Sequence, residues 1–140
     1  MIVGGFAVIH AGHTRATFDL DILLDSDPHN TRLALDSLMI LEDGAAGSVE
    51  PTEIAEYTVV RICDEITVDL MASACGVTFE EAKGEIIWHE IQGVPIPFAS
   101  PKLLWWTKQT YRDKDAFDRS FLAELLTKQG STVPPPPLNS

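Results

Sequence analysis

The sequence predicts an α/β (α+β) domain in which helices pack on a mixed β-sheet. Segments with a period-two alternation of apolar and polar residues, typical of strands, are interspersed with segments that open on a capping residue and a proline, typical of helices. The two kinds of segment do not follow each other one for one, so a regular parallel βαβ arrangement is not expected.

Strict alternation and short apolar runs mark the expected strands. In Ala16–Leu24 the side chains of Asp19 and Asp21 fall on one side and the large apolar side chains fall on the other. Two later pairs of runs are expected to form hairpins around Asp64 and around Gln92-Gly93, and two prolines place the last strand at an edge or end of the sheet. The expected strands are Met1–Val3, Ala16–Leu24, Tyr57–Cys63, Glu65–Met71, Glu85–Ile91 and Val94–Phe98.

Capping residues mark most of the expected helices. Asp27 and Ser100 are each followed by a proline, which suits the first helical position, and Thr78 with Glu81 has the spacing of a capping box. The expected helices are Phe6–Ala11 (one or two turns), Asp27–Met39, Thr78–Lys83, Ser100–Tyr111 and Asp113–Lys128, and residues 43–51 are expected to form a loop.

Length and composition indicate one globular domain with a tail. The chain has 140 residues, of which 45% are hydrophobic and 22% are charged. No apolar run reaches the roughly 18 residues that a membrane helix needs, and the chain does not open on a basic signal-peptide region. We therefore expect a cytoplasmic protein with no membrane partner. The domain is expected to span residues 1–128, followed by a disordered proline-rich tail over residues 129–140.

The charge balance argues against long-range attraction to nucleic acid. The chain holds 21 acidic and 10 basic residues, a formal net charge of −11. Such a surface repels nucleic acid unless a local basic patch or bound metal ions overcome the repulsion. The four histidines show no H-x-x-x-H pair, so a zinc site is not expected.

Three aspartates form the candidate reaction centre. Asp19 and Asp21 lie two apart on an expected strand, which places their carboxylates on one face, roughly 6.5 Å apart along the chain. Carboxylates this close repel each other unless a cation lies between them, and Mg²⁺ prefers such oxygen ligands. Asp69 alternates with apolar residues on another strand, and a two-metal site becomes geometrically feasible where the two strands are neighbours. The alternative is an ordinary exposed strand face with acidic residues.

A glycine pair precedes these aspartates. Gly4-Gly5 stands where an apolar strand runs into a short helix, and glycines at such a junction let backbone N–H groups approach a phosphate. The alternative for such a pair is a simple tight turn.

Together these segments resemble the nucleotidyltransferase superfamily, which has a polymerase-β-like fold, and within it the group of AbiEii-type toxins of type IV toxin–antitoxin systems. The first part of the likeness is G-G-F-A-V-I-H-A-G-H-T-R-A-T-F-D-L-D, spaced as in that group's Gly-Gly…His-Arg-x-Ser-x-Asp-x-Asp signature. Arg15 and Thr17 fall at the Arg and Ser positions, and Thr14 separates His13 from Arg15, which is a departure from the pattern.

A second segment continues the likeness, which covers roughly residues 2–126. Residues 100–104 followed by Lys108–Asp115 look like the Lys-x5-Lys-Asp segment of the group, and Asp118 and Leu122 continue it into the following helix. For Lys108 and Lys114 a solvated helix face is the alternative.

The resemblance implies nucleotidyl transfer, in which an acceptor hydroxyl attacks the α-phosphate of a nucleoside triphosphate and pyrophosphate leaves. It implies that Asp19, Asp21 and Asp69 are the catalytic residues and ligate two Mg²⁺ ions, or Mn²⁺ in their place, and that Asp69 can draw the proton from the hydroxyl. Asp115 would orient the lysine that neutralises phosphate charge. The implied nucleotide-binding residues are Gly4, Gly5, Arg15, Thr17, Lys108, Lys114 and Asp115.

The implied partners are a nucleoside triphosphate, an acceptor and, for a toxin, a cognate antitoxin. The acceptor classes are a tRNA 3′ end, a protein hydroxyl and a small molecule. Two alternatives to an enzyme stand beside this hypothesis. One is a non-catalytic nucleotidyltransferase-fold module that binds a nucleotide or a protein, and the other is an unrelated acidic α/β interaction domain.

Overall fold

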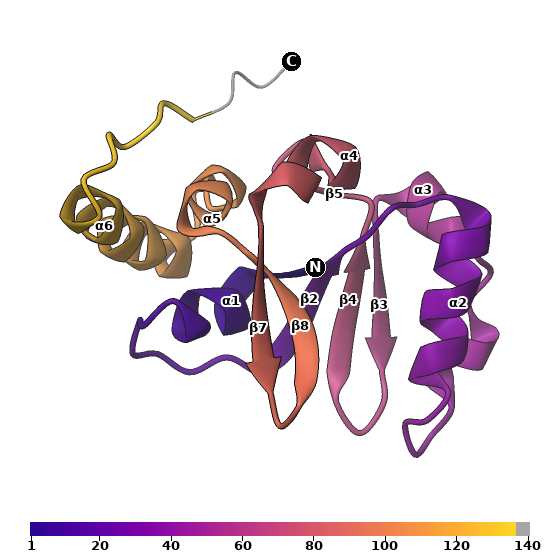
Figure 1. Cartoon of the computed structure of the whole chain (residues 1–140). Coiled ribbons are helices and arrows are strands. Elements are labelled where there is room, and N and C mark those ends of the chain that lie inside the picture. Colours follow the sequence, from indigo (N-terminus) through magenta and orange to yellow (C-terminus); the bar gives the residue numbers. More distant parts are fainter. Residues whose placement is uncertain (137–140) are drawn as a thin grey trace.

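The computed structural model describes residues 1–136, in which a mixed sheet separates two groups of helices (Figure 1). The six strands of this sheet, in spatial order, are β3 (Val59–Cys63), β4 (Thr67–Met71), β2 (Asp19–Leu23), β1 (Ile2–Val3), β8 (Val94–Ala99) and β7 (Ile86–Ile91). A separate ribbon is formed by β5 (Ser73–Ala74) and β6 (Val77–Thr78). The mixed α/β class is confirmed.

The α-helices of the described residues alternate irregularly with the strands, as expected. They are α1 (Gly4–His10), α2 (Pro28–Leu38), α3 (Glu53–Tyr57), α4 (Phe79–Ala82), α5 (Pro101–Thr107) and α6 (Asp113–Lys128), with short 3-10 helices at Ala45–Ser48 and Lys83–Glu85. Within residues 1–136, none of these helices has both the length and the apolar character required to cross a membrane.

The sheet is mixed because its two parallel pairs alternate with antiparallel ones. β2 runs parallel to β4, and β1 runs parallel to β8, whereas the β1–β2, β3–β4 and β7–β8 pairs are antiparallel. The β2–β4 register sets Asp21 directly opposite Asp69. This pairing brings together two segments that lie almost fifty residues apart in the chain.

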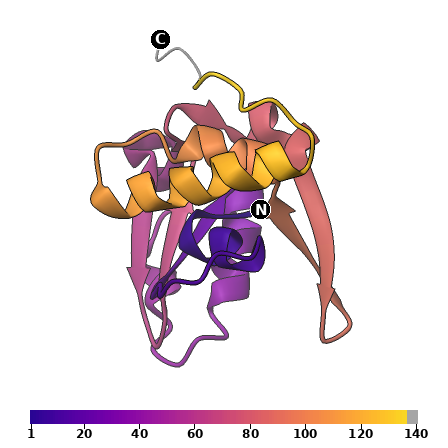
Figure 2. The same cartoon turned by 90° about the vertical axis from the view of Figure 1, so that its left-hand side faces the viewer.

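One core lies between the sheet and the group formed by α1, α5 and α6, which faces the viewer in Figure 2. Val8 of α1, Leu23 of β2 and Leu122 of α6 are fully buried there. Leu103 and Leu104 of α5 complete it. Because strand side chains alternate, the face of β2 that carries Leu23 also carries Asp19 and Asp21. The polar residues therefore extend from the edge of this core.

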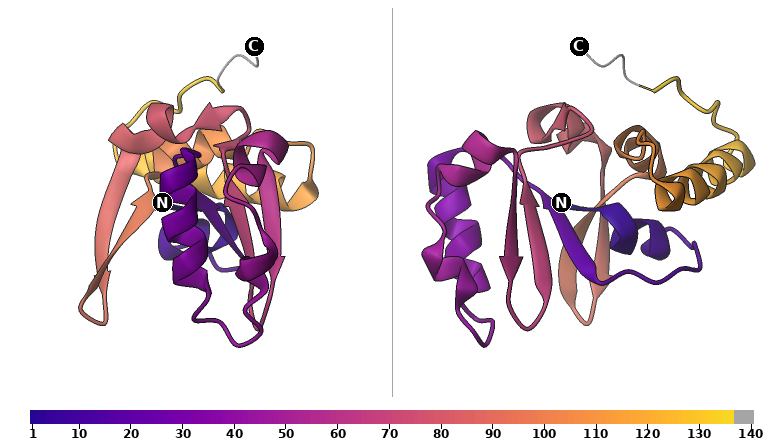
Figure 3. Two further views of the ribbon diagram at one scale, coloured as in Figure 1. Left: turned by 90° about the vertical axis from the view of Figure 1, so that its right-hand side faces the viewer. Right: turned by 180° about the vertical axis from the view of Figure 1, so that it is seen from behind.

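The second core lies on the opposite face, where α2 covers the sheet (Figure 3, left). Leu35 of α2 and Ile54 of α3 pack in the same cluster as Val68 and Leu70 of β4. These two residues flank Asp69 in sequence, so burying them on one face turns the Asp69 carboxylate to the other. The core on this side thereby fixes where Asp69 points.

The three expected helix caps are confirmed. The Asp27 carboxylate accepts hydrogen bonds from the backbone N–H groups of His29 and Asn30, and the Ser100 hydroxyl accepts one from Leu103. Thr78 and Glu81 form the complete capping box. An N-cap of this kind contributes about 1 kcal/mol to the stability of its helix.

The expectation that the proline-bearing strand lies at the edge of the sheet was wrong. β8 lies between β1 and β7, and β7 forms the edge. The two-residue β1 borders β8 only at Phe98, so Pro95 and Pro97 lie in a stretch that has a neighbouring strand on one side only. Proline is tolerated there because it interrupts no second ladder of hydrogen bonds.

Other differences concern short elements and the tail. The helix expected to reach Tyr111 ends at Thr107, and α3, the two 3-10 helices and the β5–β6 ribbon were not predicted. α6 ends at Lys128 as expected. Beyond it, the indole N–H groups of Trp105 and Trp106 donate to the carbonyls of Pro134 and Pro135, at 2.7 and 3.2 Å, so this part of the tail contacts α5. Residues 137–140 of the predicted disordered tail lie outside the described residues.

The first core makes a stability prediction. Leu103 is fully buried, so Leu103→Ala removes apolar contacts and leaves a cavity, and we expect a loss of about 2–5 kcal/mol in the free energy of unfolding. Leu33, which is 54% exposed on α2, is the matched control, with an expected change within about 0.5 kcal/mol. Urea unfolding followed by tryptophan fluorescence measures both. Equal losses in the two variants would contradict the packing described here.

Candidate functional site

A polar pocket lies beside β2 and β4, on the face of the sheet that carries α1. All the residues that the sequence singled out, except Asp115, line this pocket. Its lining is Val3, Gly4, Gly5, Arg15, Thr17, Asp19, Asp21, Arg61, Asp69, Met71, Ala74, Thr107, Lys108, Arg112 and Lys114. Residues from both ends of the chain therefore meet in one place.

The three aspartates come together through the pairing of β2 with β4. Asp21 and Asp69 are register partners, and Asp19 lies one pleat away from Asp21 on the same face. The two strands are neighbours, which is the condition that the sequence argument set for the three carboxylates to share a site. Asp69 is only 7% exposed. Burial, together with the nearby charge of Asp69, raises the pKa of the Asp21 carboxyl above its ordinary value. The pocket thus holds a carboxylate that is poorly compensated.

Arg61 is a site residue that the sequence interpretation missed. It lies on β3 opposite Asp69, and its guanidinium donates from Nε to Oδ1 of Asp69 at 2.9 Å and from Nη2 to Oδ2 at 2.8 Å. The same Nη2 donates to Oδ2 of Asp19 at 3.1 Å. These bonds raise the pKa of the guanidinium further, so it stays charged. The signal that could have found it is a lone basic residue on the hairpin partner of the Asp69 strand.

The aspartate set was tested for its fit to a divalent cation. As the side chains lie, no three Asp, Glu, His or Cys residues within residues 1–136 converge closely enough to hold an ion, and the Arg61 guanidinium joins Asp19 to Asp69 instead. The donor chemistry nevertheless suits Mg²⁺, which prefers carboxylate oxygens. Within residues 1–136, Arg61 donates to Asp69 and Asp19 and not to Asp21. Burial beside Asp69 raises the pKa of the Asp21 carboxyl, and a bound cation would favour its ionised form. Asp19, Asp21 and Asp69 are the residues that would hold it.

The glycine pair brings backbone against these side chains. Gly4 has φ +67°, and a Cβ added there would lie 1.8 Å from Oδ2 of Asp21. A Cβ on Gly5 would lie 2.5 Å from Oγ1 of Thr17. Side chains are excluded at both positions, so the chain passes closer to Asp21 and Thr17 than any other residue type allows.

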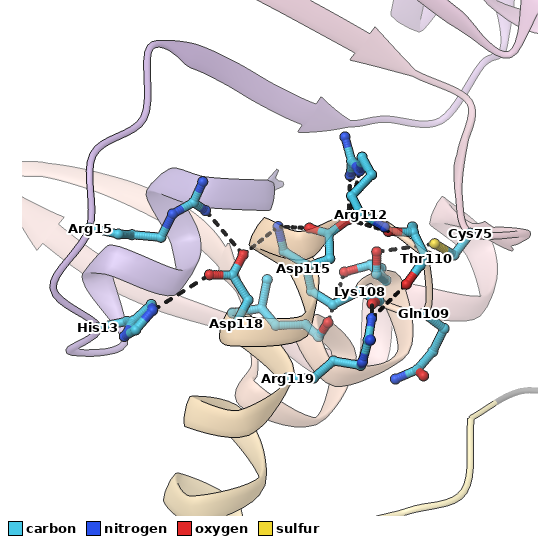
Figure 4. A network of polar contacts seen from close by, with 12 residues as sticks. His13, Arg15, Cys75, Lys108, Gln109, Thr110, Arg112, Asp115, Asp118 and Arg119 are labelled. Carbon is cyan, nitrogen blue, oxygen red and sulfur yellow. Dashed lines mark hydrogen bonds and ion pairs between the residues drawn. The ribbon is translucent and has the colours of Figure 1, made fainter.

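Lys108 lies in a buried ion network behind the pocket (Figure 4). Its Nζ is 3.0 Å from Oδ1 of Asp115 and 2.9 Å from Oδ2 of Asp118, and both carboxylate side chains are fully buried. Arg15 Nη1 donates to the same oxygen of Asp118 at 3.0 Å. Lys108 is itself only 5% exposed, which excludes a solvated helix face for this residue. Lys114 is exposed and faces the same pocket.

Asp115 holds the loop that follows α5 in place by accepting its hydrogen bonds. It accepts hydrogen bonds from Lys108, from the Thr110 hydroxyl and, at 2.7 Å, from Nε of Arg112. Burial alone would raise the pKa of Asp115, but the bonds from Thr110 and Lys108 outweigh it and hold the pKa below its ordinary value. Asp115 thus holds the Lys108 ammonium in place and does not itself line the pocket.

The roles of Thr110, Arg112 and Asp118 in this network were missed because they depend on where α5 ends. The sequence predicted a helix to Tyr111, whereas the chain leaves the helix after Thr107 and folds back over Asp115. Arg119 secures this fold-back by donating to the carbonyls of Lys108 and Thr110. A helix continued to Tyr111 would not have produced these contacts.

The pocket therefore combines three carboxylates with several cations, although the whole chain is acidic. The basic side chains that line it are Arg15, Arg61, Lys108, Arg112 and Lys114. Such an arrangement suits an anionic ligand bound together with a metal ion, such as a phosphate ester. The chain matches no family model, and its sequence matches no curated protein.

The buried network makes a stability prediction. Lys108→Met removes the shared charge between Asp115 and Asp118 and leaves two buried carboxylates undercompensated, so we expect a loss of about 3–5 kcal/mol in unfolding free energy. Lys128→Met is the control, because its pair with Glu124 is exposed and contributes about 0–1 kcal/mol. Chemical denaturation at neutral pH separates the two. A Lys108→Met chain as stable as the control would refute the buried network.

The lowered pKa of Asp115 predicts how stability depends on pH. A carboxyl with a depressed folded-state pKa stabilises the fold above its unfolded pKa, and this contribution is lost as the pH falls through the folded value. The stability gap between the wild type and Asp115→Asn should therefore be widest near pH 7 and should narrow below the ordinary pKa of 3.8. Urea unfolding across that range measures the gap. A gap that does not change with pH would show that Asp115 carries no such charge linkage.

Proposed function

We propose that the chain is a metal-dependent nucleotidyltransferase with the polymerase-β-like fold, which moves a nucleoside monophosphate from a nucleoside triphosphate to an acceptor hydroxyl. The observation that carries this proposal is the meeting of Asp19, Asp21 and Asp69 on one face of β2 and β4, beside the glycine pair with which α1 begins. A carboxylate cluster next to a backbone turn and several cations is what phosphoryl chemistry needs.

Each residue has a defined part in the proposed reaction. When bound to the aspartates, Mg²⁺ supplies charge neutralisation at the reacting phosphate and orients it. Asp69 takes the proton of the acceptor hydroxyl, and the hydroxyl oxygen forms a bond to the α-phosphorus. The bond from that phosphorus to the bridging oxygen breaks, and pyrophosphate leaves with the electron pair. The Gly4-Gly5 backbone and Lys114 hold the triphosphate.

The remaining implied residues hold this arrangement in place. Thr17 packs against Gly5, and Arg15 joins the pocket wall to Asp118 of α6. Asp115 and Asp118 hold the Lys108 side chain, so its positive charge keeps one position at the pocket. An ordered charge of this kind stabilises a transition state without reorganising.

The proposal includes partners that the pocket alone does not select. An acceptor hydroxyl on a tRNA 3′ end, on a protein or on a small molecule fits the same chemistry. The resemblance to AbiEii-type toxins extends the proposal to a cytoplasmic toxin with a cognate antitoxin.

A second candidate function is a nucleotidyltransferase-fold module that binds a nucleotide or a protein without turnover. The observation that favours it is the position of Arg61, whose guanidinium joins Asp19 to Asp69 and satisfies the carboxylates without a metal. The two candidates differ in whether bound triphosphate is converted to pyrophosphate.

A labelling experiment tests the proposal. We expect the chain, incubated with Mg²⁺, cell extract and each labelled nucleoside triphosphate in turn, to release pyrophosphate and to label one acceptor. Asp21→Asn should lower the rate by about 100-fold or more, because the carboxylate that binds the metal is lost. Asp36→Asn on the exposed face of α2 is the matched control and should leave the rate unchanged.

Two results would count against nucleotidyl transfer in this pocket. Stabilisation of the chain by a triphosphate and Mg²⁺ without pyrophosphate release favours the non-catalytic module. Pyrophosphate release that survives Asp21→Asn would mean that the activity does not come from this pocket.

A further inference from the structure

Arg61 already forms the kind of contact with the aspartates that a metal ion would form. We propose that Arg61 is a built-in counter-ion, which holds the carboxylates of Asp19 and Asp69 while no metal is bound and is displaced when a divalent cation enters. This inference rests on the proposed function, because it takes the aspartates as the metal ligands. It adds an exchange step between a protein cation and the metal.

The geometry makes the two cations compete for the same oxygens. The Arg61 fork occupies both oxygens of Asp69, at 2.9 and 2.8 Å, and reaches Oδ2 of Asp19 at 3.1 Å. A metal ion that joins Asp69 to the β2 aspartates would contact one of these oxygens, each of which already accepts a hydrogen bond from Arg61. Two cations on such a small set of oxygens repel each other, which favours opening of the Arg61 bonds.

The exposure of the partners shows which one can move. The Asp69 side chain is 10% exposed and is anchored between Val68 and Leu70 of the second core, whereas the Arg61 side chain is 55% exposed. β3 is the edge strand of the sheet, so among residues 1–136 no further strand restrains Arg61 from the outside. The guanidinium can therefore turn into solvent without displacing the core, and the carboxylate stays where the metal needs it.

Arg61 also solves a problem of the metal-free pocket. Without a cation, the like charges of Asp19, Asp21 and Asp69 face one another on a partly desolvated surface. The Arg61 bonds neutralise part of that charge and keep the ligands pre-arranged. The same bonds lower the affinity for the incoming metal, because that metal must replace them. Removing Arg61 should therefore weaken the metal-free fold and strengthen metal binding, which are opposite effects of one contact.

The test uses Mn²⁺, which electron paramagnetic resonance detects, with no nucleotide present. We expect Arg61→Met to bind Mn²⁺ roughly tenfold more tightly than the wild type, because one competing charge is gone. Arg61→Lys keeps the charge and loses the planar fork, so its Mn²⁺ affinity should lie between the two. Arg32→Met is the control, because Arg32 is exposed on α2 and forms a single long ion pair with Glu50, at 3.9 Å. The Mn²⁺ affinity of this variant should equal that of the wild type.

Thermal unfolding gives a second readout. Without metal, Arg61→Met should melt below the wild type, and Mn²⁺ should raise its melting temperature by more than it raises that of the wild type. If Arg61→Met does not fold, the rise in melting temperature that Mn²⁺ gives is compared between Arg61→Lys and the wild type instead.

The outcomes separate this inference from the proposed function. In one outcome, Mn²⁺ binds the wild type, does not bind Asp21→Asn, and binds the Arg61 variants no more tightly than the wild type. That result overturns the counter-ion role and leaves the metal site standing. If Mn²⁺ binds neither the wild type nor the Arg61 variants, both the counter-ion role and the metal-dependent function are overturned.

Discussion

Mutual repulsion among the three carboxylates is the constraint on which the rest of the structure depends. Asp19, Asp21 and Asp69 share one face because the parallel β2–β4 pairing and the two apolar cores leave them no other direction. Such a cluster is costly unless cations offset it. Arg61 supplies one positive charge by bonding the carboxylates directly. Basic side chains between the end of α5 and the start of α6 add further positive charges around the same pocket. We propose that a pocket arranged around this charge holds divalent ions and phosphate.

The buried network of Lys108, Asp115 and Asp118 links the C-terminal helices to this pocket. α6 is anchored at its first two turns by ion pairs to Lys108 and Arg15, which belong to opposite ends of the chain. Removing one partner of such a buried pair leaves the other charge uncompensated, so the network holds α6 to Lys108 and Arg15, which both line the pocket.

Much of the fold follows from local sequence signals, and part of the site does not. Alternation around Asp19 and capping at Asp27, Ser100 and Thr78 are local, and they predicted the correct elements. The place of β8 inside the sheet depends on β1, a two-residue strand too short to have a period. Arg61 was missed because its role depends on the cross-strand register, and the sequence analysis predicted the hairpin without assigning its register.

The central claim is that Asp19, Asp21 and Asp69 bind a divalent cation that takes over the place of Arg61. A crystal structure with Mn²⁺, using anomalous scattering to locate the ion, tests this most directly. The account predicts an anomalous peak within coordination distance of Asp21 and of at least one of the other two carboxylates, with the Arg61 guanidinium turned away from Asp69. A structure grown in millimolar Mn²⁺ that shows no peak there, with Arg61 still joining Asp19 to Asp69, would contradict it.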